Sequence, residues 1–379
     1  MTGESTSPEQ HSSVPDSTVE SSASRLRITA CADDGHQVGP WASEISSSLM
    51  QYAQRLTHPT ELLQLVDSVT PDSIDRSPGF YTMLEMLHHL APLPTTSSWR
   101  TLHLCEAPGG FVHAARRWLA ARHPAVAFDW RAVSLAAGAG PALYTALAAE
   151  RQANGHARVM GGADGKGDIT LSRNADYMIR EAGRTMIHFV TADGGESFDK
   201  SGAGSGAEAA NIPLVCAECF IALRVLATGG TLVLRMSGLA ERETHILLAL
   251  LVPIFRHCEL LVPDTVPLTD SVIYLAACDL LPPAAPLDET IRQVQRRAFT
   301  PATVLYQAPF MQDPLDGWSE RCLAADAHIA SLRAARLERA SNLAYFMHST
   351  GVSEATQPSR DVMSELLRDP AQLCRLIVP

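Results

Sequence analysis

The chain has 379 residues, of which 46% are hydrophobic and 19% charged, and its formal net charge is −11 at pH 7. This composition is ordinary for a globular protein with a sizeable core. No apolar run is long enough to span a membrane, and the N-terminus lacks the basic start and apolar stretch of a secretory signal. We therefore expect an intracellular protein of the nucleus or cytoplasm, with an organelle as the alternative. The acidic balance excludes indiscriminate nucleic-acid binding, which needs clustered positive charge, but allows a local basic groove.

The N-terminal part divides into two segments by composition. Residues 1–40 are rich in Ser, Thr, Glu and Pro and poor in large apolar residues, so they cannot offset the entropy lost on ordering. We expect them to form a disordered tail. From Trp41 to about Leu90, apolar residues recur at three- and four-residue spacing, which predicts a helical segment over residues 41–98.

Short β-rich runs then alternate with helical stretches over residues 99–280. The pattern predicts strands at 99–105, 126–135, 186–192, 231–236, 259–262 and 272–278. It predicts helices from the turn at 109 to 122 and over 142–152, 212–227 and 242–252. This alternation is typical of a doubly wound, Rossmann-like α/β sheet that is largely parallel. The last two strands have no helix-length segment between them, so we expect them to pair antiparallel.

The last hundred residues change character again. Prolines mark a break after residue 281, and residues 288–347 are predicted to be mostly helical, within a C-terminal extension over 281–379. Arginines recur on the predicted helices, at Arg116, Arg117, Arg122, Arg292, Arg296, Arg297, Arg333, Arg336 and Arg339. Interspersed acids favour a solvated face, and an RNA-contacting or protein-docking surface is the alternative.

The cysteines offer little chemistry. Only Cys216 and Cys219 are close in sequence, and they fall in an apolar helical stretch with no second pair to complete a zinc site. We expect buried thiols and no metal centre.

The strongest local signal is the segment 102–111, in which a predicted strand runs into a turn with paired glycines and a helix begins at once. Gly109 and Gly110 let the backbone approach a ligand closely. The helix N-terminus offers free N–H groups and partial positive charge to an anionic group. An ordinary strand-to-helix turn is the alternative. The dinucleotide pattern G-x-G-x-x-G is not met, which argues against a nicotinamide enzyme.

Three ordered motifs resemble those of one family. Glu-Ala-Pro-Gly-Gly-Phe at 106–111 resembles the first motif of the FtsJ-like RNA ribose 2′-O-methyltransferases. Residues 165–170 are similar to the Gly-Asp-Gly-Asp-Ile-Thr segment of eukaryotic mRNA cap 2′-O-methyltransferases, and residues 190–195 resemble their Ala-Asp-Gly-Gly block. The resemblance covers about residues 70–280, and it favours the cap branch over a ribosomal-RNA branch.

The resemblance implies S-adenosylmethionine as cofactor and RNA as partner. The 106–111 turn would hold the methionine part, and Asp168 would accept from the adenine amino group. No carboxylate ends the second predicted strand, so Ser134 or a backbone group would have to bind the ribose. The candidate cofactor residues are Cys105, Glu106, Ala107, Pro108, Gly109, Gly110, Phe111, Ser134, Asp168, Ile169 and Asp193.

The family's catalytic tetrad is Lys-Asp-Lys-Glu, and only its Asp is retained, as Asp193. Thr82 and Arg235 stand at the two Lys positions and Val272 at the Glu position. Arginine stays protonated at any working pH and cannot replace a lysine base, although its planar fork can hold a phosphate or hydroxyl. The chain has only two lysines, Lys166 and Lys200.

Two functions remain open on these residues. The first is a catalytically impaired member of the family that acts as an RNA- or protein-binding module in a ribonucleoprotein or capping assembly. The second is an active RNA 2′-O-methyltransferase with a divergent centre built from Asp193 and Arg235, with Lys200 or Asp270 as further candidates. A small-molecule methyltransferase is disfavoured because the motifs match RNA enzymes.

Overall fold

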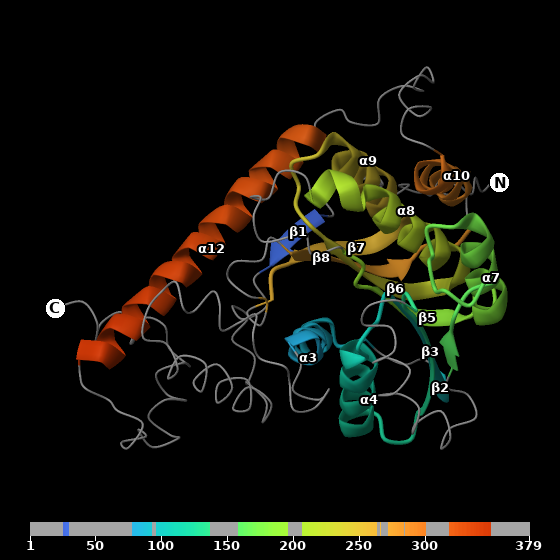
Figure 1. Ribbon diagram of the computed structural model, residues 1–379, viewed down its shortest axis with the longest axis horizontal. Coiled ribbons are helices and arrows are strands. Elements are labelled where there is room, and N and C mark those ends of the chain that lie inside the picture. The colour runs from blue at the N-terminus through green and yellow to red at the C-terminus, as the bar shows by residue number, and fades with distance from the viewer. Residues whose placement is uncertain are drawn as a thin grey trace, which may run out of the picture.

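A single eight-stranded sheet forms the centre of the computed structural model, in the order β1-β7-β8-β6-β5-β2-β3-β4 (Figure 1). The structure describes residues 26–29, 78–92, 96–136, 158–195, 207–263, 266, 272–283, 285–300 and 318–349. The strands are β1 (Leu26–Thr29), β2 (Ser98–Leu104), β3 (Ala127–Val133), β4 (Arg158–Met160), β5 (Ile187–Ala192), β6 (Leu226–Met236), β7 (Phe255–Leu261) and β8 (Ile273–Leu280).

All strand pairs are parallel except those of β8, which is antiparallel to β6 and β7. The predicted doubly wound sheet with an antiparallel last strand is therefore confirmed.

Helices cover both faces of the sheet. The helices are α3 (Pro78–Leu90), α4 (Gly110–Arg122), α7 (Ser172–Ala182), α8 (Ala207–Val225), α9 (Arg242–Leu251), η3 (Val252–Ile254), α10 (Ala285–Phe299) and α12 (Trp318–Ser349). α3 and α4 lie on one face, and α7, α8, α9 and α10 lie on the other (Figure 1). α12 begins beside α9 and extends away from the sheet. None of the helices in the described ranges is both long and apolar enough to cross a membrane.

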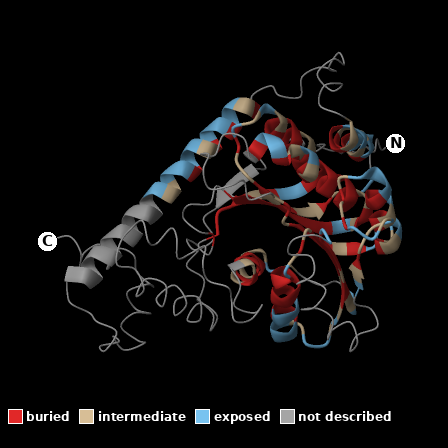
Figure 2. Ribbon diagram, viewed as in Figure 1, coloured by how far each residue is buried: buried red, intermediate tan, exposed pale blue. Residues whose placement is uncertain are grey.

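Two large hydrophobic cores and a small cluster of Val112, Trp130 and Ala132 fill the space between the helices and the sheet (Figure 2). The larger one surrounds α8, whose residues 215–223 are all buried. Cys216 and Cys219 lie in it as buried thiols, as predicted, and burial raises the pKa of Cys216 to about 12. In the smaller core, α3 and α4 pack on the sheet around Trp99 and Phe189, so α3 shares a core with the domain expected to begin at residue 99.

The expectation of a wholly disordered tail over residues 1–40 is wrong at residues 26–29. These four residues form β1, which extends the sheet by pairing parallel with β7, from Leu26↔Cys258 to Thr29↔Leu261. The partner strand lies far along the chain, so local composition gave no sign of the pairing. The rest of that tail, residues 41–77 and the helix expected at 142–152 lie outside the described residues.

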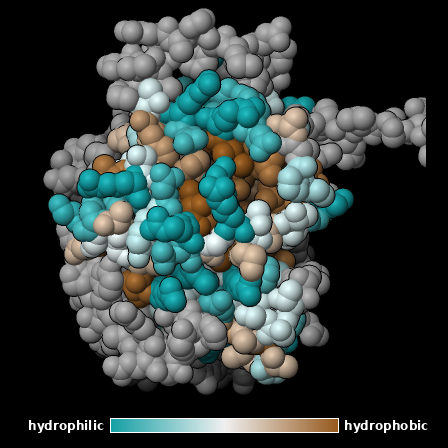
Figure 3. All heavy atoms as spheres, turned by 90° about the vertical axis from the view of Figure 1, so that its right-hand side faces the viewer, coloured by the Kyte–Doolittle hydropathy of each residue, from teal (hydrophilic) through white to brown (hydrophobic). Residues whose placement is uncertain are grey.

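Two arginines of α10 form ion pairs with acids. Arg297 is 7% exposed and pairs with Glu243 at 3.0 Å, and Arg292 pairs with Glu289 at 2.7 Å. Figure 3 shows that hydrophilic residues alternate with apolar ones on the side of the molecule where α7 and α10 lie. These contacts favour the structural interpretation of the α10 arginines over an RNA-binding surface.

Candidate functional site

The loops that follow β2, β3 and β5 meet at the carboxyl edge of the sheet. β2 and β5 are neighbours with Leu104 opposite Ala192, and the Asp193 N–H donates to Leu104 O at 3.2 Å. On the other side of β2, the Glu106 N–H donates to Val133 O at 3.0 Å. The 105–110 turn and Asp193 are thus side by side, as the sequence predicts. Ligands of doubly wound sheets bind beyond this edge.

The turn after β2 is held by its own glutamate. Glu106 Oε1 accepts the backbone N–H groups of Phe111 and Val112 at 2.8 and 3.0 Å, and Gly109 N–H donates to Glu106 O at 2.7 Å. Gly109 has a φ of 114°, which favours glycine. The expectation that the start of α4 offers free amides to a ligand is therefore wrong for Phe111 and Val112, because a side chain within the motif already binds them.

The second oxygen of Glu106 is unsatisfied. Glu106 is 3% exposed, and its Oε2 is buried without a hydrogen-bond partner. His103 Nδ1 lies 4.0 Å from this oxygen, but desolvation lowers the pKa of His103 to about 3, so the ring is neutral. Burial also raises the pKa of Glu106 well above its usual range. Because the raised pKa favours the protonated form, this oxygen suits a ligand that brings a hydrogen-bond acceptor.

Removing the Glu106 side chain should destabilise the fold, whereas a glutamine at this position should keep the hydrogen bonds that cap α4. Glu106→Ala leaves two amides of α4 unpaired and should lower the free energy of unfolding by about 0.5–2 kcal/mol, as for other helix caps. Glu106→Gln keeps the carbonyl acceptor and should stay close to the unmodified protein. Urea unfolding measures both variants, and an equal loss in the two would show that the cap does not act through this acceptor.

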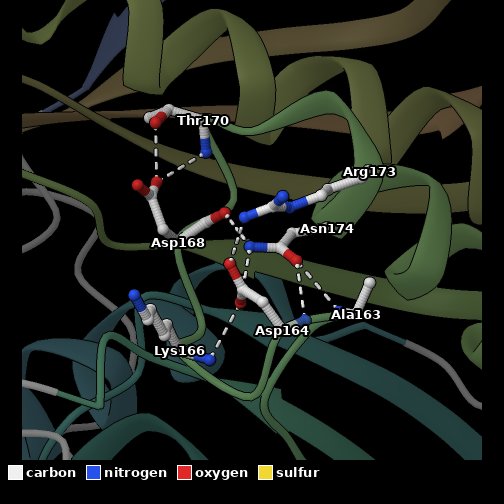
Figure 4. A network of polar contacts seen from close by, with 7 residues as sticks. All are labelled: Ala163, Asp164, Lys166, Asp168, Thr170, Arg173 and Asn174. Atoms are coloured by element: carbon white, nitrogen blue, oxygen red, sulfur yellow. Dashed lines mark hydrogen bonds and ion pairs between the residues drawn. The ribbon is translucent and has the colours of Figure 1, made fainter.

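The glycine-rich loop between β4 and α7 is organised by Asn174 (Figure 4). Asn174 Oδ1 accepts Ala163 N–H at 2.9 Å, and its Nδ2 donates to Asp164 Oδ1 at 3.1 Å and to Asp168 O at 2.8 Å. Asp164 also accepts Lys166 N–H at 3.0 Å and pairs with Arg173 at 2.8 Å. These bonds fix the path of the loop, so Asp168 is presented from a preorganised backbone.

Asp168 and Ser134 lie on adjoining segments. Asp168 Oδ1 accepts the N–H and hydroxyl of Thr170, at 3.0 and 2.6 Å, which fixes the carboxylate. An added Cβ at Gly167 would lie 1.9 Å from Ser134 O, so the two backbones touch. The Ser134 hydroxyl accepts Ala107 N–H at 3.3 Å. The segment after β3 therefore joins the 105–110 turn to the 161–168 loop, while Ile169 beside Asp168 is buried.

Asp193 contacts two residues of the neighbouring strands. The Tyr274 hydroxyl donates to Asp193 Oδ1 at 2.9 Å, and Arg235 Nε lies 3.9 Å from the same oxygen. Arg235 on β6 and Tyr274 on β8 face each other in the antiparallel register. Sequence reasoning missed Tyr274, although a tyrosine within an apolar strand is a signal, since a buried hydroxyl needs a partner.

The two glycines after Asp193 lie close to side chains of neighbouring elements. An added Cβ at Gly194 would lie 2.5 Å from Glu218 Oε1 and 2.9 Å from Leu214 Cδ2. At Gly195 it would lie 1.8 Å from Arg235 Nη1. The sequence analysis did not single out Glu218. The signal that could have found it is a lone carboxylate within an apolar helical stretch, since such a group is rarely buried without a role. Side chains of α8 and β6 thus contact the loop after β5 at Gly194 and Gly195.

The residues expected at the other two tetrad positions carry no ionisable side chain. Thr82 on α3 and Val272 before β8 are each 3% exposed. Val272 belongs to the smaller core, and its carbonyl accepts Arg333 Nη2 of α12 at 3.0 Å. Lys200 and Asp270, the candidates to fill the missing roles, lie outside the described residues.

The charges at this edge fit a cationic ligand. Burial raises the pKa of the Cys105 thiol, and the nearby carboxylates of Asp168 and Asp193 raise it further. Glu106 adds a buried oxygen without a partner. S-adenosylmethionine carries a sulfonium and an ammonium group, so its chemistry matches these residues.

Comparisons with known proteins agree with this geometry. A family model of FtsJ-like methyltransferases matches residues 76–279. The chain is 31% identical over 199 residues to cap-specific mRNA (nucleoside-2′-O-)-methyltransferase 2 of Danio rerio, and 33% identical over 178 residues to the protein of that name in Mus musculus. The alignments cover 48% and 46% of this chain. They cover only 25% and 23% of the relatives, so the chain spans about a quarter of the relatives' length.

Among solved structures, a putative S-adenosyl-L-methionine-dependent methyltransferase from Methanococcus maripaludis is 9% identical, with a TM-score of 0.34 over 59% of this chain and 93% of that chain. The family model spans more than half of the chain, from α3 to the end of β8. The chain therefore belongs to the FtsJ-like methyltransferase family.

Proposed function

We propose that this protein binds S-adenosylmethionine at the carboxyl edge of the sheet and binds RNA beside it, with its own ribose 2′-O-methylating activity impaired. It would act as an RNA- or protein-binding module of a capping or ribonucleoprotein assembly. The names of the relatives, which are cap-specific mRNA methyltransferases, favour capped mRNA over ribosomal RNA. The observation that carries the proposal is the set of groups around Asp193.

Methylation of a ribose hydroxyl needs a group that accepts its proton. The bound cofactor would supply the methyl group, so the protein must orient the hydroxyl and remove the proton. Arg235 remains protonated and offers only donors. Thr82 and Val272 offer no base, and Asp193 already accepts the Tyr274 hydroxyl. The site can therefore hold an RNA hydroxyl or phosphate through Arg235, but it lacks the family's proton acceptor.

One observation favours the alternative of an active enzyme. The Tyr274 hydroxyl lies within the site, on the strand position opposite Arg235 and 2.9 Å from Asp193. A tyrosine is a base only as its phenolate, a form that a neighbouring guanidinium stabilises. In this version of the mechanism the phenol proton passes to Asp193, and the Tyr274 phenolate then accepts the proton of the ribose hydroxyl in place of the missing lysine.

RNA binding tests the proposed role directly. Fluorescence anisotropy with short capped and uncapped RNAs, in the presence of the cofactor, should show saturable binding that favours the capped form. Arg235→Gln should weaken that binding, because it removes a charge-assisted contact. Equal and negligible binding of both RNAs would rule out an RNA-binding role.

Asp168 provides a test of the cofactor site. Asp168→Ala should weaken S-adenosylmethionine binding by about 1–3 kcal/mol, because a charged hydrogen-bond partner of the ligand is lost. The matched control is Asp176→Ala, which removes an exposed carboxylate from the following helix and should leave the affinity unchanged. Calorimetric titration measures both, and an equal change in the two variants would mean that Asp168 does not contact the cofactor.

A further inference from the structure

One buried carboxyl group links the two loops of the site and has no part in the reaction described above. Glu218 lies on α8 and is fully buried, with 0% of its surface exposed. Its Oε1 accepts the Gly194 N–H at 2.9 Å, and it hydrogen-bonds the thiol of Cys105. Cys105 begins the turn after β2, and Gly194 follows Asp193 after β5. A single side chain from the helix beneath therefore joins the cofactor turn to the loop that carries Asp193.

The surroundings of Glu218 do not suit a carboxylate ion. The ionisable groups that face it are Cys105, Asp193, Cys219 and Arg235. Burial raises the pKa of Glu218 to about 8, and the Asp193 charge adds to this, against the opposing effects of the Gly194 N–H, the Cys105 thiol and Arg235. Oε2 is buried and accepts no hydrogen bond, which would leave half of an ionised carboxylate without a partner.

We propose that Glu218 is a positioning residue that works as a neutral acid, fixing the Asp193–Gly195 loop against the cofactor turn. The inference rests on the proposed cofactor site, since it assigns the residue that holds the two halves of that site together. The competing role is an ionised counter-ion of Arg235, which would stand in for the carboxylate missing at Val272. The two roles predict opposite results for an uncharged substitute, because it can replace a neutral acid but cannot replace a counter-ion.

Glu218→Gln and Glu218→Ala separate these roles. Gln keeps the oxygen that accepts Gly194 N–H and has no charge, whereas Ala removes the clamp. With the folded state verified for each protein, S-adenosylmethionine is titrated calorimetrically at pH 7. The expected result is a Kd for Gln within about threefold of the unmodified protein and at least a tenfold weaker Kd for Ala. Comparable losses in both variants would overturn the neutral-acid role in favour of the counter-ion.

A second measurement does not need the cofactor. The folded protein keeps the Glu218 proton up to about pH 8, whereas the unfolded chain releases it near the ordinary value of about 4.5. The unmodified protein should therefore lose stability relative to Glu218→Gln as pH rises from 5 to 8, by up to about tenfold in the unfolding constant per pH unit. Titrating groups that do not face Glu218 are common to both proteins and cancel in the difference.

Cofactor titration and the pH dependence of stability test the cofactor site and the role of Glu218 separately. If the unmodified folded protein binds no cofactor, the proposed cofactor site is wrong and Glu218 is judged by the stability difference alone. If that difference between the unmodified protein and Glu218→Gln does not change between pH 5 and 8, Glu218 is not a neutral acid in the folded state and this inference is overturned.

Discussion

Gly167→Ala should abolish cofactor binding and destabilise the protein. Gly167 has a φ of 73°, in the left-handed region, and its added Cβ would lie 1.9 Å from Ser134 O and 2.7 Å from Ser134 C. Both are backbone atoms that cannot turn aside. The left-handed conformation costs an L residue about 1–2 kcal/mol. The clash adds about 1–3 kcal/mol, as overpacking does in other proteins. The segment after β3 would separate from the 161–168 loop, and the Ala136 N–H to Lys166 O bond would break.

The same loop offers a matched control. Gly165 has a φ of 75°, but nothing lies within 4 Å of the Cβ that Gly165→Ala would add. This variant carries the same conformational cost without the clash, so it should lose only about 1–2 kcal/mol of stability. Its Kd for S-adenosylmethionine should stay within about threefold. Thermal unfolding and calorimetry on the two variants are the measurements, and indistinguishable behaviour would mean that the Ser134–Gly167 contact does not shape the site.

The unmodified protein should transfer no detectable methyl group to capped RNA. A positioned general base contributes about 10²–10⁴ in rate, and Arg235, Thr82 and Val272 supply none. Radiolabelled transfer to a capped RNA, with Asp193→Ala as the blank, measures this. Activity that depends on Asp193 would contradict the impaired site. Tyr274→Phe would then show whether the phenol is the base, because removing its hydroxyl should eliminate that activity.

The triple change Thr82→Lys, Arg235→Lys and Val272→Glu approaches the same question from the opposite side. It restores the family's tetrad around Asp193, so gain of methyl transfer by this variant would support the interpretation that these positions alone disable the site. Thr82 and Val272 are each 3% exposed, so the new charges would be buried and would weaken the fold.

The sequence predicted those parts of the fold that leave a local pattern. The β-rich runs at β2, β5 and β8 fall within two residues of the expected bounds, because strand periodicity depends on nearby residues. The bounds of α8 were less accurate, since it begins at Ala207 instead of residue 212, and β6 begins at Leu226, inside the stretch expected to be helical. The antiparallel β8 followed from the short connection after β7. β1 and β4 were missed, because strands of four and three residues are defined by their partners rather than by their own composition.

The candidate site was predictable in its motifs but not in its contacts. Glu106, Asp168 and Asp193 gather at one edge because their loops follow parallel strands of one sheet. The roles that Glu106 and Glu218 have in the structure come from hydrogen bonds to Phe111 and Gly194, which depend on how helices pack against these loops. The partner of Asp193 was hidden for the same reason, since Tyr274 reaches it from β8, on the far side of β6.

Calorimetric titration of the unmodified protein with S-adenosylmethionine tests the central claim most directly. The claim is that the edge formed by the 105–110 turn, Ser134, Asp168 and Asp193 still binds the cofactor although the methylating residues around Asp193 are replaced. The account predicts a single saturable site with a Kd below the millimolar range, lost in Gly167→Ala. A folded protein that produces no binding heat at millimolar cofactor would contradict it, and the family fold would then serve RNA or protein binding without the cofactor.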